Sequence, residues 1–153
     1  MIAIGVCDPR GVMGKGGNLP WHFPEDLRFF SDTVAKYPLV MGYRTCVSLP
    51  DKYFDRLVFV FTRQIREAQR GEIFVHSIEE FLTLVKTIPL LYIIGGSEIF
   101  TLFLQNKLID EFLLTEIYQP YEGDAFLPLS LFADWFRTVV RKNKDFIISQ
   151  FIR

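Results

Sequence analysis

Cysteine and histidine are scarce in this chain of 153 residues, which contains two of each. Cys7 and Cys46 stand far apart and form no C-x-x-C motif, so a metal site built from thiolate and imidazole ligands is not expected. We therefore expect both cysteines to be reduced thiols with a structural role.

An excess of charge of one sign is also missing. Lys and Arg number 17 against 18 for Asp and Glu, a net charge of -1, which gives no broad attraction to nucleic acid or to an anionic membrane. No segment approaches the ~20 consecutive apolar residues that span a bilayer, and no basic leader follows Met1. These features predict a cytoplasmic protein, in which a local anion site is still allowed.

Apolar residues make up 50% of the chain, enough to bury a substantial core, and no repeat or linker divides residues 1–153 into more than one domain. Short apolar runs predict strands, and 3.6-residue patterns predict helices between them. This alternation indicates a single-domain α/β fold with a mostly parallel central sheet flanked by helices. The predicted strands are 2–7, 39–41, 57–61, 73–75, 90–94 and 112–117, and the predicted helices are 25–34, 78–86 and 97–105.

The last third of the chain changes character, because no clear helix separates the strand at 112–117 from the strand-like run at 146–152. Two strands without a crossover helix between them are expected to pair in opposite directions. Residues 146–152 are therefore predicted to add an antiparallel C-terminal edge strand. The charged residues 141–145 before it are predicted to form a solvated hairpin turn.

Asp26 is the first candidate for chemistry. If Pro24 opens a helix, Asp26 and Phe30 at positions i and i+4 share one face, with Leu27 beside them. A carboxyl group facing an apolar pocket has a raised pKa and binds a paired N–H donor set, such as the edge of a 2-aminopyrimidine. Alternatively, Asp26 is an ordinary acid of the first turn that complements the helix dipole.

Gly95 and Gly96 form a second candidate, a turn between a buried strand and the start of a helix. Glycine lets a backbone approach a phosphate closely, and the free N–H groups of a helix start attract an anion. The spacing is not that of the G-x-G-x-x-G fingerprint, so a simple tight connection is the alternative. Residues 11–18, with four glycines, are either a mobile lid or a flexible connection.

Two further strand ends carry an arginine, at Arg44 and at Arg63. Ligands of α/β proteins bind at the carboxyl ends of the strands, where these residues are expected to lie. Thr62 and Arg63 offer a hydroxyl and a guanidinium to a 2′-phosphate, which would select NADPH over NADH. The alternative for Arg63 is a solvated surface side chain.

Five motifs in order resemble those of the dihydrofolate reductase family across essentially the whole chain. They are G-K-G-G-N-L-P-W-H-F-P-E-D-L at 14–27, M-G-Y-R-T at 41–45, I-I-G-G at 93–96, L-T-E-I at 114–117 and G-D-x-x-x-P at 123–128. The resemblance implies NADPH-dependent reduction of dihydrofolate to tetrahydrofolate, in the service of one-carbon metabolism. A hydride would pass from nicotinamide C4 to pterin C6, with protonation at N5. It also implies binding of antifolate inhibitors, and we expect a monomer.

The resemblance assigns residues to the substrate. Asp26 would bind the N3 and 2-amino edge of the pterin and promote protonation at N5, with Trp21 and Thr115 as the other catalytic residues. Arg56 would bind the α-carboxylate of the glutamate tail. The remaining substrate residues implied are Ile4, Gly5, Leu27, Phe30, Leu49 and Ile94.

A second set of residues is implied for NADPH. Those for the nicotinamide end and the lid are Val6, Met13, Gly14, Asn18 and Leu19. Those for the phosphates and the adenosine are Gly42, Arg44, Thr45, Thr62, Arg63, His76, Gly95, Gly96, Ser97, Glu98, Ile99 and Phe100. No metal is implied.

The chain departs from the family pattern at three positions, with Tyr43 in place of a basic residue, Cys46 in place of tryptophan and Phe100 in place of tyrosine. Two other functions are therefore considered: a pyrimidine reductase of riboflavin synthesis on the same fold, and an idle binding module. The pyrimidine reductase needs neither Asp26 nor Arg56. In the idle module, polar residues in an unused apolar cleft would cost stability.

Overall fold

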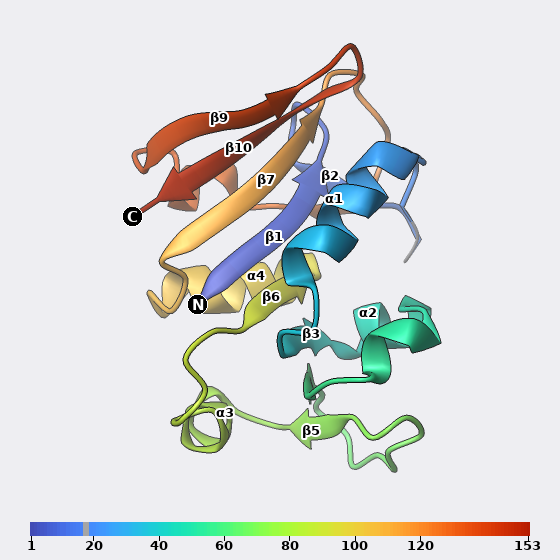
Figure 1. Cartoon of the computed structure of the whole chain (residues 1–153), viewed down its shortest axis with the longest axis vertical. Coiled ribbons are helices and arrows are strands. Elements are labelled where there is room, and N and C mark those ends of the chain that lie inside the picture. The colour runs from blue at the N-terminus through green and yellow to red at the C-terminus, as the bar shows by residue number, and fades with distance from the viewer. Residues whose placement is uncertain (17–18) are drawn as a thin grey trace.

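A computed structural model of the chain describes residues 1–16 and 19–153, and its main feature is an eight-stranded sheet in the order β5-β4-β3-β6-β1-β7-β10-β9 (Figure 1). Every neighbouring pair in this order from β5 through β4, β3, β6 and β1 to β7 is parallel. By contrast, β10 is antiparallel to both of its neighbours, β7 and β9. The bounds are β1 Ile2–Cys7, β3 Leu39–Gly42, β4 Val58–Phe61, β5 Ile73–Val75, β6 Tyr92–Gly95, β7 Glu111–Ile117, β9 Phe136–Lys142 and β10 Phe146–Ile152.

The predicted fold class is confirmed: the sheet is mostly parallel and its C-terminal strands are antiparallel. Two strand starts were predicted too early, because Leu57 and Leu90 lie before β4 and β6. Leu57 is 47% exposed, and an apolar residue outside the strand extended the apparent run. Two short strands that the sequence did not predict, β2 (Val12–Gly14) and β8 (Ala125–Phe126), pair with each other beside the main sheet.

The helices are α1 (Pro24–Val34), α2 (Tyr43–Ser48), α3 (Ile78–Leu84) and α4 (Ser97–Gln105), and 3-10 turns cover Asp51–Phe54 and Leu129–Leu131. Pro24 opens α1 as predicted, since its fixed φ suits the first turn. The hydroxyl of Ser77 accepts a hydrogen bond from the backbone of Glu80 and caps α3, which ends two residues before the predicted Lys86. Within the described ranges no helix has the length and hydropathy to cross a membrane.

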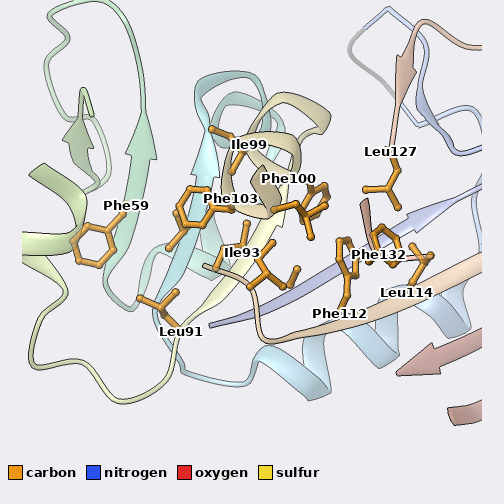
Figure 2. Packing of buried hydrophobic residues seen from close by; sticks show 14 of the residues in the cluster. Phe59, Leu91, Ile93, Ile99, Phe100, Phe103, Phe112, Leu114, Leu127 and Phe132 are labelled. Carbon is orange, nitrogen blue, oxygen red and sulfur yellow. The ribbon is translucent and has the colours of Figure 1, made fainter. Parts of the chain in front are cut away.

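Side chains alternate between the two faces of the sheet, and each face is covered by helices. Leu39 and Met41 of β3 pack with Val34 of α1 and Cys46 of α2, whereas Val40 faces the cluster that contains α3 and α4. That second cluster is rich in phenylalanine and includes Phe100, Phe103, Phe112 and Phe132 (Figure 2). A parallel sheet covered on both faces explains the near-continuous apolar runs in the sequence.

β9 is the edge of the sheet, and β10 lies inside it between β7 and β9. All seven residues of β9 are exposed, so no apolar alternation marks this strand in the sequence. Arg137, Arg141 and Lys142 give the edge a positive charge that disfavours pairing with a second copy of the same strand.

Candidate active site

Asp26 and Thr115 meet between α1 and the centre of the sheet. Thr115 is in β7, paired with Val6 of β1, and is 3% exposed. Its Oγ1 donates a hydrogen bond to Oδ1 of Asp26 at 2.7 Å. Burial raises the pKa of Asp26, and the bond from Thr115 lowers it by a smaller amount, so the pKa stays above its ordinary value. The result is a partly desolvated acid group at a fixed position.

An apolar cluster lies on the same face of the sheet as α1. It brings together four of the predicted substrate residues, Ile4, Phe30, Leu49 and Ile94. The ring of Phe30 lies 5.5 Å from that of Tyr53 in an edge-on arrangement. These side chains provide an apolar surface that could hold a flat heterocycle beside a carboxyl group.

Leu27 is 46% exposed and lies outside this cluster, on the open side of α1. Gly5 of β1 packs instead against the opposite core: a Cβ there would lie 3.2 Å from the ring of Phe100. Because that ring is held within a packed cluster, a larger residue at position 5 would press on it (Figure 2).

Arg56 is fixed beside the C-terminal end of α1. Its side chain is 6% exposed, and its Nε donates to Oδ1 of Asp55 at 3.0 Å. Its Nη1 donates to the carbonyl oxygen of Ala35, the residue that follows α1. The guanidinium also lies 5.4 Å from the ring of Tyr53. This arrangement orders the cation at the far end of the apolar cluster from Asp26.

The segment before α1 is tied to the loop before β8. The amide of Gly16 donates to Oδ2 of Asp124 at 3.1 Å, and the amide of Asp124 donates to the carbonyl oxygen of Gly14 at 3.0 Å. Trp21 is buried and its ring lies 5.3 Å from that of Tyr121. The described part of the predicted lid is thereby attached to Asp124 through Gly14 and Gly16. The predicted cofactor residue Asn18 lies outside the described residues.

Of the other residues predicted for the nicotinamide side, Val6 packs on the cluster that contains Trp21, and Met13 packs on the larger core. Leu19 is 53% exposed. Buried Gly14 sits in β2, where its carbonyl accepts the bond from Asp124. These residues therefore line the lid side of the sheet without forming one packed group.

The glycine turn lies at the carboxyl end of β6. Gly95 has a φ of +119° and is joined to Gly96 by a cis peptide bond, and α4 begins at Ser97. Among the described residues, no side chain caps the start of α4. The first N–H groups of this helix can therefore bind an anion. A Cβ at Gly96 would lie 3.7 Å from Oγ1 of Thr45, so that hydroxyl faces the turn.

The remaining residues predicted for this turn differ in how far their side chains are buried. Ile99 and Phe100 are buried, and Ile99 leaves so little space that a Cβ at Gly42 would lie 3.1 Å from it. Ser97 is half-buried, and Glu98 is exposed. The ends of β3 and β6 and the starts of α2 and α4 thus converge on one small region.

Thr62 follows β4 and anchors the next turn. Its carbonyl oxygen lies 2.9 Å from Nδ1 of His76, and its amide donates to Val75. Arg63 is 93% exposed, with its guanidinium 4.0 Å from the carboxylate of Glu98. Arg44, in the first turn of α2, is also exposed.

Three polar residues near the site were missed by sequence reasoning. The guanidinium of Arg66 lies 3.4 Å from the ring centre of Tyr43, and its Nε donates to Oγ1 of Thr62 at 3.0 Å. Asp8 and Glu72 are buried carboxylates that accept backbone hydrogen bonds. Nothing local in the sequence marks them, because their partners are backbone groups or residues distant along the chain.

Cys46 and Cys7 are free and buried, as expected of structural thiols. Arg70 packs against Cys46, with its Nη2 3.7 Å from Sγ of Cys46. The same guanidinium donates through Nη1 to the carbonyl oxygen of Leu49 at 2.8 Å. Arg70 therefore fixes the backbone at one wall of the apolar cluster.

Residues 1–147 match the sequence profile of the protein family described as "Dihydrofolate reductase". The chain belongs to the dihydrofolate reductase family. It is 32% identical over 126 residues to the dihydrofolate reductase of Haemophilus influenzae, a match that covers 82% of this chain and 77% of that protein. It is 35% identical over 133 residues to that of Enterococcus faecium, covering 82% and 76% of the two chains.

A solved structure is similar over almost its whole length. The dihydrofolate reductase from Enterococcus faecalis, complexed with NADP(H) and RAB-propyl, has a TM-score of 0.78 and 28% sequence identity, and the match covers 99% of this chain and 95% of that one. Membership of the dihydrofolate reductase family makes the chain an NADPH-dependent oxidoreductase of folate metabolism.

Proposed function

We propose that the apolar surface beside Asp26, between α1 and the sheet, binds the pterin of dihydrofolate, which is reduced to tetrahydrofolate there, with Asp26 as its anchor. The hydrogen bond from Thr115 to Asp26 carries this proposal. It holds Oδ1 of the carboxyl group and leaves Oδ2 without a partner among the described residues, so that the two oxygens can accept from two parallel N–H donors of a pterin edge. Ile4, Phe30 and Ile94 would pack against the ring, and Leu27 would close over it from the open side.

Arg56 is proposed to bind the α-carboxylate of the glutamate tail, with Leu49 against the aminobenzoyl group. The guanidinium is already ordered by Asp55 and by the carbonyl oxygen of Ala35. An ordered fork loses little further entropy when it binds a carboxylate. The substrate would then extend from Asp26 at one end of α1 to Arg56 beyond the other.

The cofactor residues fit a dinucleotide. The glycine turn has no side chain to fill the space in front of the start of α4, and Thr45 adds a hydroxyl from α2. Gly95, Gly96 and Ser97 would hold the pyrophosphate, and Arg44, Thr62 and Arg63 the phosphates toward the adenosine. When bound, NADPH supplies the hydride that pterin C6 accepts.

Asp26 also promotes the protonation of N5. A raised pKa increases the fraction of Asp26 that is protonated near neutral pH, so the group can promote protonation of N5 through water. Trp21 and the attached lid would exclude bulk water from the reacting rings, and the two ligand sites would set their alignment. In this proposal residues 1–153 act as one folding unit in the cytoplasm, as a monomer that antifolates inhibit.

The experiment that tests this function offers purified protein NADPH together with either dihydrofolate or a ribosylamino-pyrimidine. Oxidation of NADPH that requires dihydrofolate, and that an antifolate blocks, is the expected result. Turnover of the pyrimidine alone would instead establish the riboflavin-type reductase. Binding of NADPH without turnover of either substrate would indicate the idle binding module.

A further inference from the structure

The turn after β4, residues 62–66, folds back and brings Arg66 against Tyr43. Nε of Arg66 donates to Oγ1 of Thr62 at 3.0 Å, and its guanidinium carbon lies 3.4 Å from the centre of the Tyr43 ring. Tyr43 and Thr62 directly follow paired strand ends, because Gly42 of β3 and Phe61 of β4 are register partners. Arg66 is therefore held at the edge of the sheet that carries the proposed cofactor site.

We infer that Arg66, stacked on Tyr43, binds the 2′-phosphate of NADPH and sets the preference for NADPH over NADH. This assignment rests on the proposed cofactor site. A guanidinium stacked on a ring keeps its in-plane N–H groups at its edge, where a phosphate can accept two of them in parallel. Within the described part of the chain, Nη1 and Nη2 of Arg66 have neither a hydrogen-bond acceptor nor an ion-pair partner.

The anchor of Arg66 is itself fixed. Thr62 is buried, its amide donates to Val75, and its carbonyl oxygen contacts Nδ1 of His76. Its Oγ1 accepts from the amide of Gln64 as well as from Arg66, which closes the turn. Binding of a phosphate would therefore require little new ordering of Arg66, which favours affinity.

Arg63, the other arginine of this turn, is a weaker candidate. Its side chain is 93% exposed, so it must lose its rotamer freedom to hold a phosphate. Its guanidinium also lies 4.0 Å from the carboxylate of Glu98, which attracts the cation and repels an incoming phosphate. Arg63 is expected to contribute less to the choice of cofactor than Arg66.

Tyr43 replaces the basic residue that the family pattern has at this position, and its contact with Arg66 gives the substitution a physical meaning. An aromatic face attracts a guanidinium and holds it flat. The positive charge that is lost at position 43 is thus supplied by the turn after β4. Tyr43 acts as a positioning residue, and Arg66 makes the contact with the phosphate.

The test measures binding of adenosine 2′,5′-bisphosphate and of 5′-AMP, two fragments that differ only in the 2′-phosphate. Arg66→Ala is expected to weaken the bisphosphate roughly tenfold or more and 5′-AMP less than about twofold. Arg63→Ala should show a smaller selective loss. Arg153→Ala, which removes one positive charge at the opposite end of the strands, should leave both affinities unchanged.

Tyr43→Phe should keep the stacking and the selectivity, whereas Tyr43→Leu should lose most of the selectivity. Arg66→Lys, which retains the charge without the planar fork, should fall between wild type and Arg66→Ala, and it serves in place of Arg66→Ala if that variant unfolds. Equal weakening of both fragments, or selectivity that depends on Arg63 and not on Arg66, would overturn the assignment. Because the fragments bind without dihydrofolate, this result is independent of whether the protein reduces folate.

Discussion

Thr115 of β7 donates a 2.7 Å hydrogen bond to Asp26 in the first turn of α1, across 89 positions of the sequence. The bond joins the centre of the sheet to the helix that covers it. One oxygen of the carboxyl group is thereby fixed, and the other has no hydrogen-bond partner among the described residues. The proposed role of Asp26 as both an anchor and a proton donor depends on this geometry.

Replacing Thr115 with valine removes the hydroxyl and keeps the shape of the side chain. We expect kcat/KM for dihydrofolate to fall by roughly 10- to 100-fold, because a hydrogen bond to a charged group contributes about 1.5 to 3 kcal/mol. Steady-state kinetics would check this, with Thr138→Val on exposed β9 as the matched control. Unchanged kinetics in folded Thr115→Val would show that the bond does not position Asp26.

Asp26→Asn should stabilise the fold at neutral pH. Burial raises the pKa of Asp26 above its ordinary value of 3.8, so the folded state binds the proton more tightly than the unfolded state. The ionised group therefore costs stability above that value, and the cost is absent in acid. Urea unfolding should show a gain for Asp26→Asn at about pH 7 that shrinks toward about pH 4. A variant less stable than wild type at neutral pH would contradict this.

The strands of the sheet could be predicted from the sequence where their burial requires a run of apolar residues. Runs covered on both faces, such as β1 and β6, were recognised from continuous apolar residues. β9 was missed because an edge strand with every residue exposed has no such pattern. The sequence also could not show that β10 would lie inside the sheet, since that depends on β9 pairing with it.

Asp8 is expected to support the loops beside the lid. It is fully buried, its Oδ1 accepts from the amides of Val12 and Arg10, and its Oδ2 accepts from that of Tyr121. Asp8→Ala leaves these donors unpaired at about 1–3 kcal/mol each, so the free energy of unfolding should fall by at least about 3 kcal/mol. Exposed Asp134→Ala is the control, and a loss below about 1 kcal/mol would refute this role.

The acid stability of the protein should also depend on Asp8. Burial alone raises the pKa of Asp8, but the hydrogen bonds from the three backbone amides, together with the nearby charge of Arg10, outweigh it and lower the pKa below 3.8. A lowered pKa contributes stability that is present above the ordinary value and is lost as the pH falls through the lower value. On acidification, the free energy of unfolding of Asp8→Asn should therefore decrease less than that of wild type. Urea unfolding at a series of pH values would measure this. An identical pH dependence would contradict the assignment.

Arg56→Ala should raise KM for dihydrofolate by roughly 10- to 100-fold, the range for loss of a charge-assisted hydrogen-bonded pair. A dihydropterin that lacks the aminobenzoyl-glutamate tail serves as the matched substrate, and its kinetics should hardly change. Arg56→Lys keeps the charge but loses the fork, so it should recover only part of the affinity. Equal losses with both substrates would mean that Arg56 acts only through its bond to Ala35.

Asp124→Ala should slow turnover by releasing the lid. Both carboxylate oxygens of Asp124 lie within 3.3 Å of the amide of Gly16. Loss of one such bond, at about 1 kcal/mol, corresponds to roughly a fivefold decrease in kcat if the attached lid is the reactive state. Asp124→Asn retains an acceptor and should keep most of the rate. A kcat for Asp124→Ala equal to that of wild type would show that this contact does not limit the reaction.

The candidate site was predicted less completely than the fold. Helix periodicity made Asp26 a candidate, whereas Thr115 was named only from the family resemblance, because the contact between them spans 89 positions of the chain. Arg66 was not predicted, since a basic residue in a turn is ordinary until the fold stacks it on Tyr43. Residues whose partners are backbone groups, such as Asp8, leave no pairwise signal in a single sequence.

The most direct test of the central claim compares Asp26→Asn with Asp32→Asn, an exposed acid on the same helix. The measurement is the dihydrofolate-dependent oxidation of NADPH at neutral pH, followed by the loss of NADPH absorbance. The account predicts that wild type and Asp32→Asn turn over alike, and that Asp26→Asn loses roughly 10²- to 10⁴-fold in kcat while remaining folded. Near-normal turnover by folded Asp26→Asn would contradict it.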